Sequence, residues 1–265
     1  MESAEVDAGY ARVTATGPSP ATQRLRRYNN RIKRYLIDSA MATAPFGPDG
    51  VRVLDACCGK GGDMGKMLEY GRVRSYTGLD LCADAIAEAR RREATHNRKR
   101  AAVDFVVGDL CSEQLEPSAY GFVNLQMALH YFFGDAERAR AAVGAVAGCM
   151  APNGVLALSV PNASVVAALL DGDLEPSEQF RVARVGEWRA PTALGCGYRF
   201  FMEGSVPDLV EYVVPLDKLL ALTRECGLRC ISLQPFDKLA AHMRLAPPAS
   251  AVEGALYVGG LFRRQ

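Results

Sequence analysis

The sequence has few residues in spacings that bind metal ions. It contains three histidines and eight cysteines, and no two cysteines stand in a CxxC pair. Structural zinc sites are usually built from such pairs, so we expect no metal cofactor. Cysteines without a secretory signal are typical of reduced thiols inside a cell. The sequence therefore predicts a nuclear or cytoplasmic protein, and it fits a cellular or a viral origin.

Long hydrophobic runs and a strong net charge are also absent. No segment approaches the roughly 18 apolar residues that cross a bilayer, and the N-terminus lacks the basic start and apolar centre of a signal peptide. Small residues, glycine and proline predict a disordered tail over residues 1–21, followed by one domain over 22–265. Because the formal net charge is only +1, we expect neither a membrane nor DNA as a partner.

Residues 22–41 predict a helix, because apolar side chains recur at spacings of three and four. The other face of this helix is basic and holds Arg24, Arg26, Arg27, Arg31, Lys33 and Arg34. A polyanionic substrate would need a local cluster of this kind, since the protein as a whole is nearly neutral.

Strand-like and helix-like segments alternate after this helix. The predicted strands are residues 51–55, 75–80, 103–107, 122–126 and 154–160, and the predicted helices are one ending at 68, 83–93 and 135–150. A less regular part follows, with strands predicted at 180–185, 197–203, 228–233 and 255–262 and a helix at 215–226. This alternation favours a parallel sheet with helices on both faces.

A glycine-rich turn joins the first predicted strand to the helix that follows, in the segment VLDACCGKGGD at 53–63. In a doubly wound sheet this turn lies at the carboxyl edge, where ligands bind. Glycines such as Gly59 let the backbone approach a ligand closely. Taken alone, the turn fits nucleotides and methyl donors equally.

Three aspartates at successive strand ends narrow the choice: Asp55, Asp80 and Asp109. Asp80 is placed to accept both ribose hydroxyls of an adenosine, and Asp109 to contact the adenine end. Each alone could be a turn carboxylate or a helix cap, but three together favour a nucleoside bound across the sheet. A dinucleotide site would need GxGxxG and amides aimed at a pyrophosphate. The segment lacks that spacing and its carboxylates would repel phosphate, so a nucleoside sulfonium fits better.

Five blocks resemble the cellular and viral mRNA cap guanine-N7 methyltransferases, in the same order and over roughly residues 22–262. They are LRRYNNRIK at 25–33, VLDACCGKGGD at 53–63, LQMALHY at 125–131, VPN at 160–162 and GYRF at 197–200. The first two blocks together are specific, because a methyltransferase of another class has no need of both. The resemblance implies a Rossmann-like class I S-adenosylmethionine-dependent methyltransferase, an α/β fold with a mostly parallel seven-stranded sheet and helices on both faces.

The resemblance also implies roles for individual residues. The donor S-adenosylmethionine, and its product S-adenosylhomocysteine, would be bound by Lys33, Asp55, Cys57, Gly59, Asp80, Asp109, Gln126 and Tyr131. The cap of a 5′-capped RNA would be bound by Asn29, Lys60, Arg92, His130, Tyr131, Pro161, Tyr198, Phe200, Glu211 and Tyr257. Other capping-enzyme subunits or domains are further partners that the resemblance suggests.

Two positions depart from the family pattern. The family usually has glycine where this chain has Cys57, and an aromatic residue where it has Met127. A Cβ atom at Cys57 would crowd the donor or oppose a positive φ. The thioether of Met127 can still pack against a base.

The expected reaction, mRNA (guanine-N7) methylation, needs no general acid or base, since guanine N7 carries a lone pair and no proton. Catalysis would come from alignment of the reacting atoms, with Tyr131, Glu211 and His130 as positioning residues. Glu211 could accept hydrogen bonds from N1–H and N2–H₂ of guanine, which adenine cannot donate in the same pattern. On local evidence alone, Glu211 could also be an exposed strand residue, and His130 a structural histidine.

Basic residues are candidates for the cap triphosphate and the first nucleotides: Arg24, Arg27, Arg31, Lys60 and Arg92. Binding through them should weaken as salt rises. A second basic cluster, at 90–92 and 98–100, offers another edge for RNA.

Two other functions remain open from the residues. A methyltransferase of another substrate would keep the donor residues but would give Asn29 and Glu211 no role. A non-catalytic scaffold subunit would have lost donor binding, with Cys57 as a first sign. Retention of Lys33, Asp80 and Gln126 argues against the scaffold.

Overall fold

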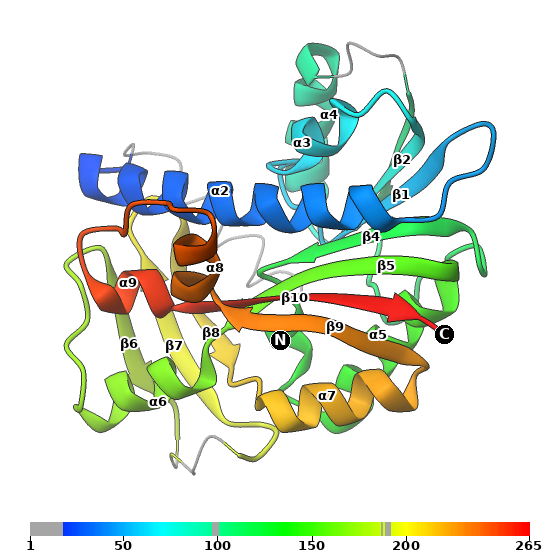
Figure 1. The fold of residues 1–265 in the computed structure, drawn as a ribbon. Coiled ribbons are helices and arrows are strands. Elements are labelled where there is room, and N and C mark those ends of the chain that lie inside the picture. Colours follow the sequence, from blue (N-terminus) through cyan, green and yellow to red (C-terminus); the bar gives the residue numbers. More distant parts are fainter. Residues whose placement is uncertain (1–17, 97–100, 187, 189–191) are drawn as a thin grey trace.

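A seven-stranded sheet forms the centre of the computed structural model, which describes residues 18–96, 101–186, 188 and 192–265 (Figure 1). In spatial order its strands are β3 (Ala102–Val107), β2 (Val73–Asp80), β1 (Val51–Ala56), β4 (Tyr120–Gln126), β5 (Met150–Pro161), β10 (Tyr257–Arg264) and β9 (Leu228–Pro235). Neighbouring strands are parallel, except that β10 runs antiparallel to β5 and to β9. The predicted mostly parallel seven-stranded sheet is confirmed.

Helices cover both faces of this sheet. One face carries α2 (Pro20–Thr43), α3 (Met64–Leu68), α4 (Ala83–His96) and α8 (Phe236–His242). The other face carries α5 (Ala136–Cys149) and α7 (Leu216–Glu225). Two shorter helices, α6 (Ala163–Asp171) and α9 (Ala251–Ala255), lie beyond the end of the sheet near β6 (Figure 1).

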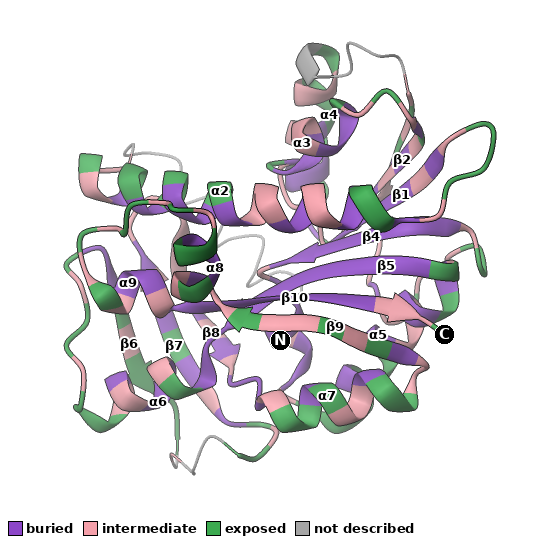
Figure 2. Ribbon diagram, in the orientation of Figure 1, coloured by how far each residue is buried: buried purple, intermediate pink, exposed green. Residues whose placement is uncertain are grey.

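The strand residues alternate between two hydrophobic cores, because successive side chains point to opposite faces of a strand. Val53 and Val155 join the core under α2, whereas Leu54 and Leu156 join the core under α5 and α7. Every residue of β4 is buried, as expected for a parallel strand covered on both faces. Figure 2 shows the central strands buried between helices whose outer faces are exposed.

A separate three-stranded antiparallel sheet contains β6 (Phe180–Arg184), β7 (Gly197–Met202) and β8 (Val206–Tyr212). The register places Tyr198 directly opposite Glu211. No strand was predicted over β8, in which Asp208 has a positive φ of 50°. The strands predicted at 180–185 and 197–203 correspond to β6 and β7, so they belong to this second sheet and not to the central one.

Several element boundaries differ from the prediction. The predicted tail lies outside the described residues up to residue 17, but Pro20 and Ala21 already belong to α2, which Ser19 caps through its hydroxyl. Met150 begins β5 instead of ending α5, and Ala255 ends α9 instead of starting β10. Helices α6, α8 and α9 were not predicted. Within the part of the chain that the structure describes, no helix is long and apolar enough to cross a membrane.

Candidate functional site

A pocket of about 630 Å³ opens at the carboxyl ends of β1, β2, β3 and β4. We call it the donor pocket. All eight residues predicted to bind the donor line it: Lys33, Asp55, Cys57, Gly59, Asp80, Asp109, Gln126 and Tyr131. Two predicted cap residues, Lys60 and Arg92, line it as well. The parallel strands bring these residues together, since their carboxyl ends meet at one edge of the sheet.

Asp80 ties the glycine-rich turn to the end of β2. Its Oδ2 accepts a hydrogen bond from the amide of Gly59 at 2.7 Å, and its Oδ1 accepts one from the amide of Cys82 at 2.9 Å. Gly59 has a φ of 53°, which glycine adopts without strain. An ionised carboxylate offers about four acceptor positions, more than these two hydrogen bonds occupy.

Asp109 is likewise both a turn residue and a wall of the pocket. It accepts hydrogen bonds from the Cys111 amide and from Arg138, both at 3.0 Å. Burial opposes its ionisation, but the bonds from Cys111 and Arg138 outweigh that and lower the pKa of Asp109. The carboxylate is therefore charged at neutral pH.

Asp55 is buried on the floor of the pocket. Tyr76 donates to its Oδ2 at 2.7 Å and Asn124 donates to its Oδ1 at 2.8 Å. Burial, reinforced by the charge of Asp63, raises the pKa of Asp55 to about 7. This carboxyl group therefore changes charge near neutral pH, where a cationic ligand would favour its ionised form.

A partly buried ion pair supports the wall of the pocket to which α2 contributes. Nζ of Lys33 lies 2.8 Å from Oδ2 of Asp63, and Lys66 bonds the other oxygen of the same carboxylate. Burial opposes ionisation of Asp63, but the two lysines outweigh it and lower the pKa of Asp63. Because α2 carries Lys33 and the glycine-rich segment carries Asp63, the pair holds α2 against the pocket.

A chain of side-chain hydrogen bonds orients Gln126. Its Oε1 accepts from Ser159 at 2.7 Å, and its Nε2 donates to Asn124 at 3.0 Å. Asn124 in turn donates to Asp55. Sequence reasoning missed Tyr76, Asn124 and Ser159, although Asn124 stands two residues before Gln126 and must share its side of β4.

The two departures from the family pattern have the same backbone conformation. Cys57 and Met127 both have φ of 55°, and both line the donor pocket. Residues other than glycine rarely adopt this left-handed region, at a cost of about 1–2 kcal/mol. The Cβ atom of Cys57 was expected to oppose a positive φ, but the residue adopts one nonetheless.

Glu211 lies at the centre of a buried polar cluster beside the donor pocket. Its side chain is 5% exposed, and Tyr198 donates to its Oε2 at 2.7 Å. The hydroxyl of Tyr131 and Nε2 of His130 each lie 3.4 Å from its Oε1. Neither ring nitrogen of His130 makes a well-aligned hydrogen bond to a described residue. Since Tyr131 also lines the donor pocket, the two sites adjoin at this side chain.

The remaining predicted cap residues are buried and do not line the donor pocket. Tyr257 stands opposite Pro161 in the β5–β10 register, and Oδ1 of Asn29 has no hydrogen-bond partner among the described residues. Phe200 packs against Phe180 at a ring separation of 5.9 Å, within the core. Their roles toward the cap stay predictions.

Residues at the start of α2 reach the rim of the donor pocket. The hydroxyls of Ser19 and Thr22 donate to Oε2 of Glu203 at 2.6 and 2.7 Å. Pro18, Gly204 and Ser205 line the pocket. The turn between β7 and β8 and the chain before α2 therefore form one rim together.

The described residues contain no group of three or more His, Cys, Asp or Glu side chains arranged to hold a metal ion. The polar side chains that line the donor pocket include carboxylates, the amide of Gln126, the lysines Lys33 and Lys60, and arginines.

The fold is shared with solved methyltransferase structures. A putative S-adenosylmethionine-dependent methyltransferase from Listeria monocytogenes matches with a TM-score of 0.58 and 17% identity, over 89% of this chain and 99% of that chain. One from Clostridium acetobutylicum matches with a TM-score of 0.60 and 10% identity, over 89% and 91% of the two chains. At such identities the likeness concerns the fold alone.

Relatives found by sequence are more similar to this chain than the solved structures are. The mRNA cap guanine-N(7) methyltransferase of Schizosaccharomyces pombe is 33% identical over 235 residues, which cover 82% of this chain and 63% of the relative. That of Saccharomyces cerevisiae is 29% identical over 237 residues, covering 81% of this chain and 53% of the relative. This chain thus spans only part of the length of these relatives. The model of the mRNA (guanine-N(7))-methyltransferase domain matches residues 15–245. With that match across most of its length, the chain belongs to the mRNA (guanine-N(7))-methyltransferase family.

Proposed function

We propose that this chain transfers a methyl group from S-adenosylmethionine to N7 of the cap guanine of GpppN-RNA. One observation carries the proposal: Tyr131 lines the donor pocket while its hydroxyl lies 3.4 Å from the buried carboxylate of Glu211. A nucleoside donor and a guanine base would meet at this side chain. Membership of the cap methyltransferase family supports the same reading.

The residues of the donor pocket fit S-adenosylmethionine. Asp80 and Asp109 end or follow neighbouring strands and offer acceptors to ribose hydroxyls and to an adenine amino group. A phosphate-bearing cofactor would meet these carboxylates unfavourably. Lys33, held by Asp63, can bind the donor's carboxylate.

The chain's own task in the reaction is alignment. When bound, S-adenosylmethionine supplies a methyl group on a positively charged sulfur. Guanine N7 has a lone pair and no proton, so Tyr131, Glu211 and His130 act by holding the base rather than by moving a proton. Such orientation can lower a barrier by about 7–11 kcal/mol.

Glu211 supplies selectivity for guanine. A guanine N1–H and N2–H₂ edge can donate to its carboxylate, which still has acceptor capacity beyond the Tyr198 bond. Adenine would leave the buried carboxylate without those donors, and unpaired buried groups can discriminate by about 10⁴–10⁵.

The partners follow from this function. Capped RNA is the substrate, other capping subunits or domains are further candidates, and the reaction requires no metal ion. The site of action is nuclear or cytoplasmic, where capped transcripts are made and used.

Methyl transfer to a panel of acceptors tests the proposal. The purified chain, given S-adenosylmethionine and GpppA-ended RNA, should form m7GpppA-ended RNA and should leave uncapped RNA and adenosine unmodified. Asp80→Ala should abolish S-adenosylhomocysteine binding, whereas Glu211→Ala should retain it and lose transfer.

The alternatives predict other results. A methyltransferase of another substrate binds S-adenosylhomocysteine but shows no preference for capped ends. A scaffold subunit does not bind S-adenosylhomocysteine at all. Either result would overturn the proposed function.

A further inference from the structure

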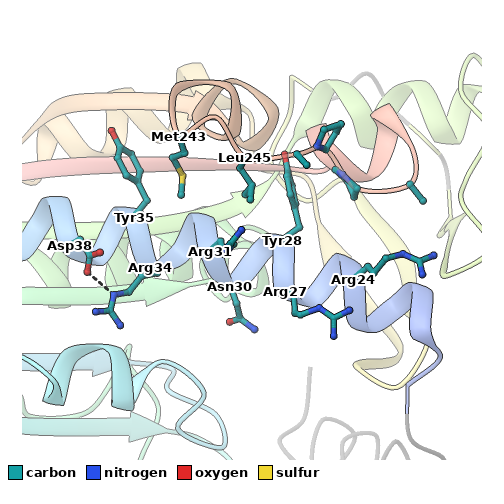
Figure 3. A pocket seen from close by; sticks show the side chains of 14 residues that line it. Arg24, Arg27, Tyr28, Asn30, Arg31, Arg34, Tyr35, Asp38, Met243 and Leu245 are labelled. Atoms are coloured by element: carbon teal, nitrogen blue, oxygen red, sulfur yellow. Dashed lines mark hydrogen bonds and ion pairs between the residues drawn. The ribbon is translucent and has the colours of Figure 1, made fainter.

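A second groove, of about 930 Å³, runs along the outer side of α2 (Figure 3). One wall is α2 itself, with Arg24, Arg27, Arg31, Arg34 and Tyr35 among its lining residues. The other wall is the segment from Met243 to Ala249, which follows α8. In Figure 3, Tyr28 and Tyr35 rise from α2 toward Met243 and Leu245. We call this the α2 groove.

The charge of the α2 groove is strongly positive. Helix α2 contains six basic residues and a single acidic one, in a chain of net charge +1. Arg34 is paired with Asp38 and Glu69. In contrast, Arg24, Arg27 and Arg31 are exposed and form no ion pair with any residue the structure describes. These three guanidinium groups are free to bind an anion.

The opposite wall is apolar and contains Met243, Leu245, Pro247 and Pro248. Tyr35, half-buried on α2, adds an aromatic ring to the same groove. Sites for single-stranded nucleic acid combine arginines, which bind the phosphates, with an apolar and aromatic surface, on which the bases stack. Stacking contributes about 1–3 kcal/mol per base.

The α2 groove and the donor pocket share one helix. Arg26 and Lys33 of α2 line the donor pocket, whereas Arg24, Arg27 and Arg31 line the α2 groove. A helix with its side chains is about 10–12 Å wide, a distance that a few nucleotides of single-stranded RNA can cross. An RNA whose cap guanine lies beside the donor pocket, at Glu211, could therefore continue over α2.

The second basic cluster, at residues 90–92 and 98–100, offers fewer unpaired cations to RNA among the described residues. Arg90 donates to the carbonyl of Phe105, and Arg91 and Arg92 both pair with Glu88. Residues 98–100 of that cluster lie outside the described residues. The guanidinium groups of this helix are thus already engaged, unlike those of the α2 groove.

We propose that the α2 groove binds the RNA chain immediately downstream of the cap, with Arg24, Arg27 and Arg31 on its phosphates. This proposal rests on the proposed function, since it places the body of the same substrate. It divides the basic residues into two groups: Lys60, which lines the donor pocket, is left to the cap, and the outer arginines of α2 act on the nucleotides that follow.

A triple variant, Arg24→Gln, Arg27→Gln and Arg31→Gln, tests this with two substrates. For a capped oligonucleotide of about twenty nucleotides, kcat/KM should fall about tenfold or more, mainly through KM. For the dinucleotide GpppA, which has no chain to follow, kcat/KM should stay within twofold. The salt dependence of oligonucleotide binding should also weaken by a slope of roughly 2, since each phosphate contact on a single strand contributes about 0.7.

A matched control removes the same charge elsewhere. Lys218→Gln, Arg224→Gln and Arg229→Gln alters three exposed residues of α7 and β9, near the opposite face of the sheet. This control should methylate both substrates like the unmodified chain. If it loses oligonucleotide activity equally, the effect is one of net charge and the α2 groove proposal is wrong.

Direct binding separates this proposal from the proposed function. Fluorescence anisotropy of an uncapped single-stranded oligonucleotide needs no methyl transfer, and the triple variant should bind it at least about fivefold more weakly. If the chain methylates no cap but the triple variant still binds the oligonucleotide more weakly, the proposed function is refuted and RNA binding in the α2 groove is supported. Unchanged oligonucleotide binding and kinetics would overturn the RNA proposal and leave the groove to an acidic protein segment.

Discussion

The hydroxyl of Tyr198 donates a 2.7 Å hydrogen bond to Oε2 of Glu211 from the position directly opposite on the neighbouring strand. Both side chains are almost fully buried. The antiparallel pairing of β7 and β8 therefore fixes the direction in which the carboxylate points. Removing either partner should disturb cap recognition more than donor binding.

We predict that Glu211→Gln lowers kcat/KM for capped RNA by about 10²–10³, as loss of a buried charged hydrogen-bond acceptor typically costs several kcal/mol. The dissociation constant of S-adenosylhomocysteine should change less than twofold. Steady-state kinetics and calorimetry measure the two quantities. Asp208→Asn is the matched control, because this exposed carboxylate is on the same strand, and it should leave both unchanged.

Cys57→Gly should stabilise the chain. Cys57 has a φ of 55°, so glycine removes a left-handed strain of about 1–2 kcal/mol and costs about 0.5–1 kcal/mol in backbone entropy. We expect the free energy of unfolding to rise by up to about 1.5 kcal/mol, and S-adenosylhomocysteine to bind at least as tightly.

Cys58→Gly is the comparison for that variant. Cys58 does not share the positive φ, and its thiol packs beside Gly78 and Phe105. Glycine at this position should therefore destabilise the chain. Urea denaturation of both variants measures the difference, and an equal effect of the two substitutions would contradict the role of backbone strain.

Asp55 should make the stability of the donor-free chain depend on pH. Burial raises its pKa from 3.8 to about 7, so the folded state holds a proton that the unfolded state has lost between these values. The contribution of Asp55 to stability therefore falls as pH rises from about 4 to about 7. Asp55→Asn removes this dependence.

Thermal denaturation of the unmodified chain and of Asp55→Asn tests the direction of this pH dependence. Asn keeps the shape of the side chain beside Tyr76 and Asn124, so Asp55→Asn should raise Tm relative to the unmodified chain at pH 8 and raise it less at pH 5. A Tm difference that shrinks with rising pH would show that Asp55 is ionised at little cost in the folded chain.

Much of the central fold could be predicted from local pattern. The spacing of Leu25, Ile32 and Leu36 predicts α2, and those side chains are fully buried. The strand ends that carry Asp55, Asp80 and Asp109 also follow from apolar runs, and all three line one pocket because parallel strands end at one edge.

Long-range packing explains what was missed. Burial of Glu211 depends on Tyr198 in a neighbouring strand and on the 3₁₀ turn that carries His130 and Tyr131, and no local pattern reports such contacts. Similarly, α6 is nearly apolar throughout, so its sequence has no helical stripe to recognise. The α2 groove needs the segment around Leu245, more than 200 residues from α2, to form its second wall.

The strand order has a consequence for how the protein is made. Strand β9 joins the central sheet through β10, which lies between β5 and β9 although it is synthesised after both. During translation β9 and α7 therefore emerge before β10, the strand that joins β9 to the sheet. Until β10 is made, β9 cannot pair with the sheet, whose edge strand is then β5. The donor pocket, built on β1 to β4, can take shape earlier than the part of the molecule that completes the core.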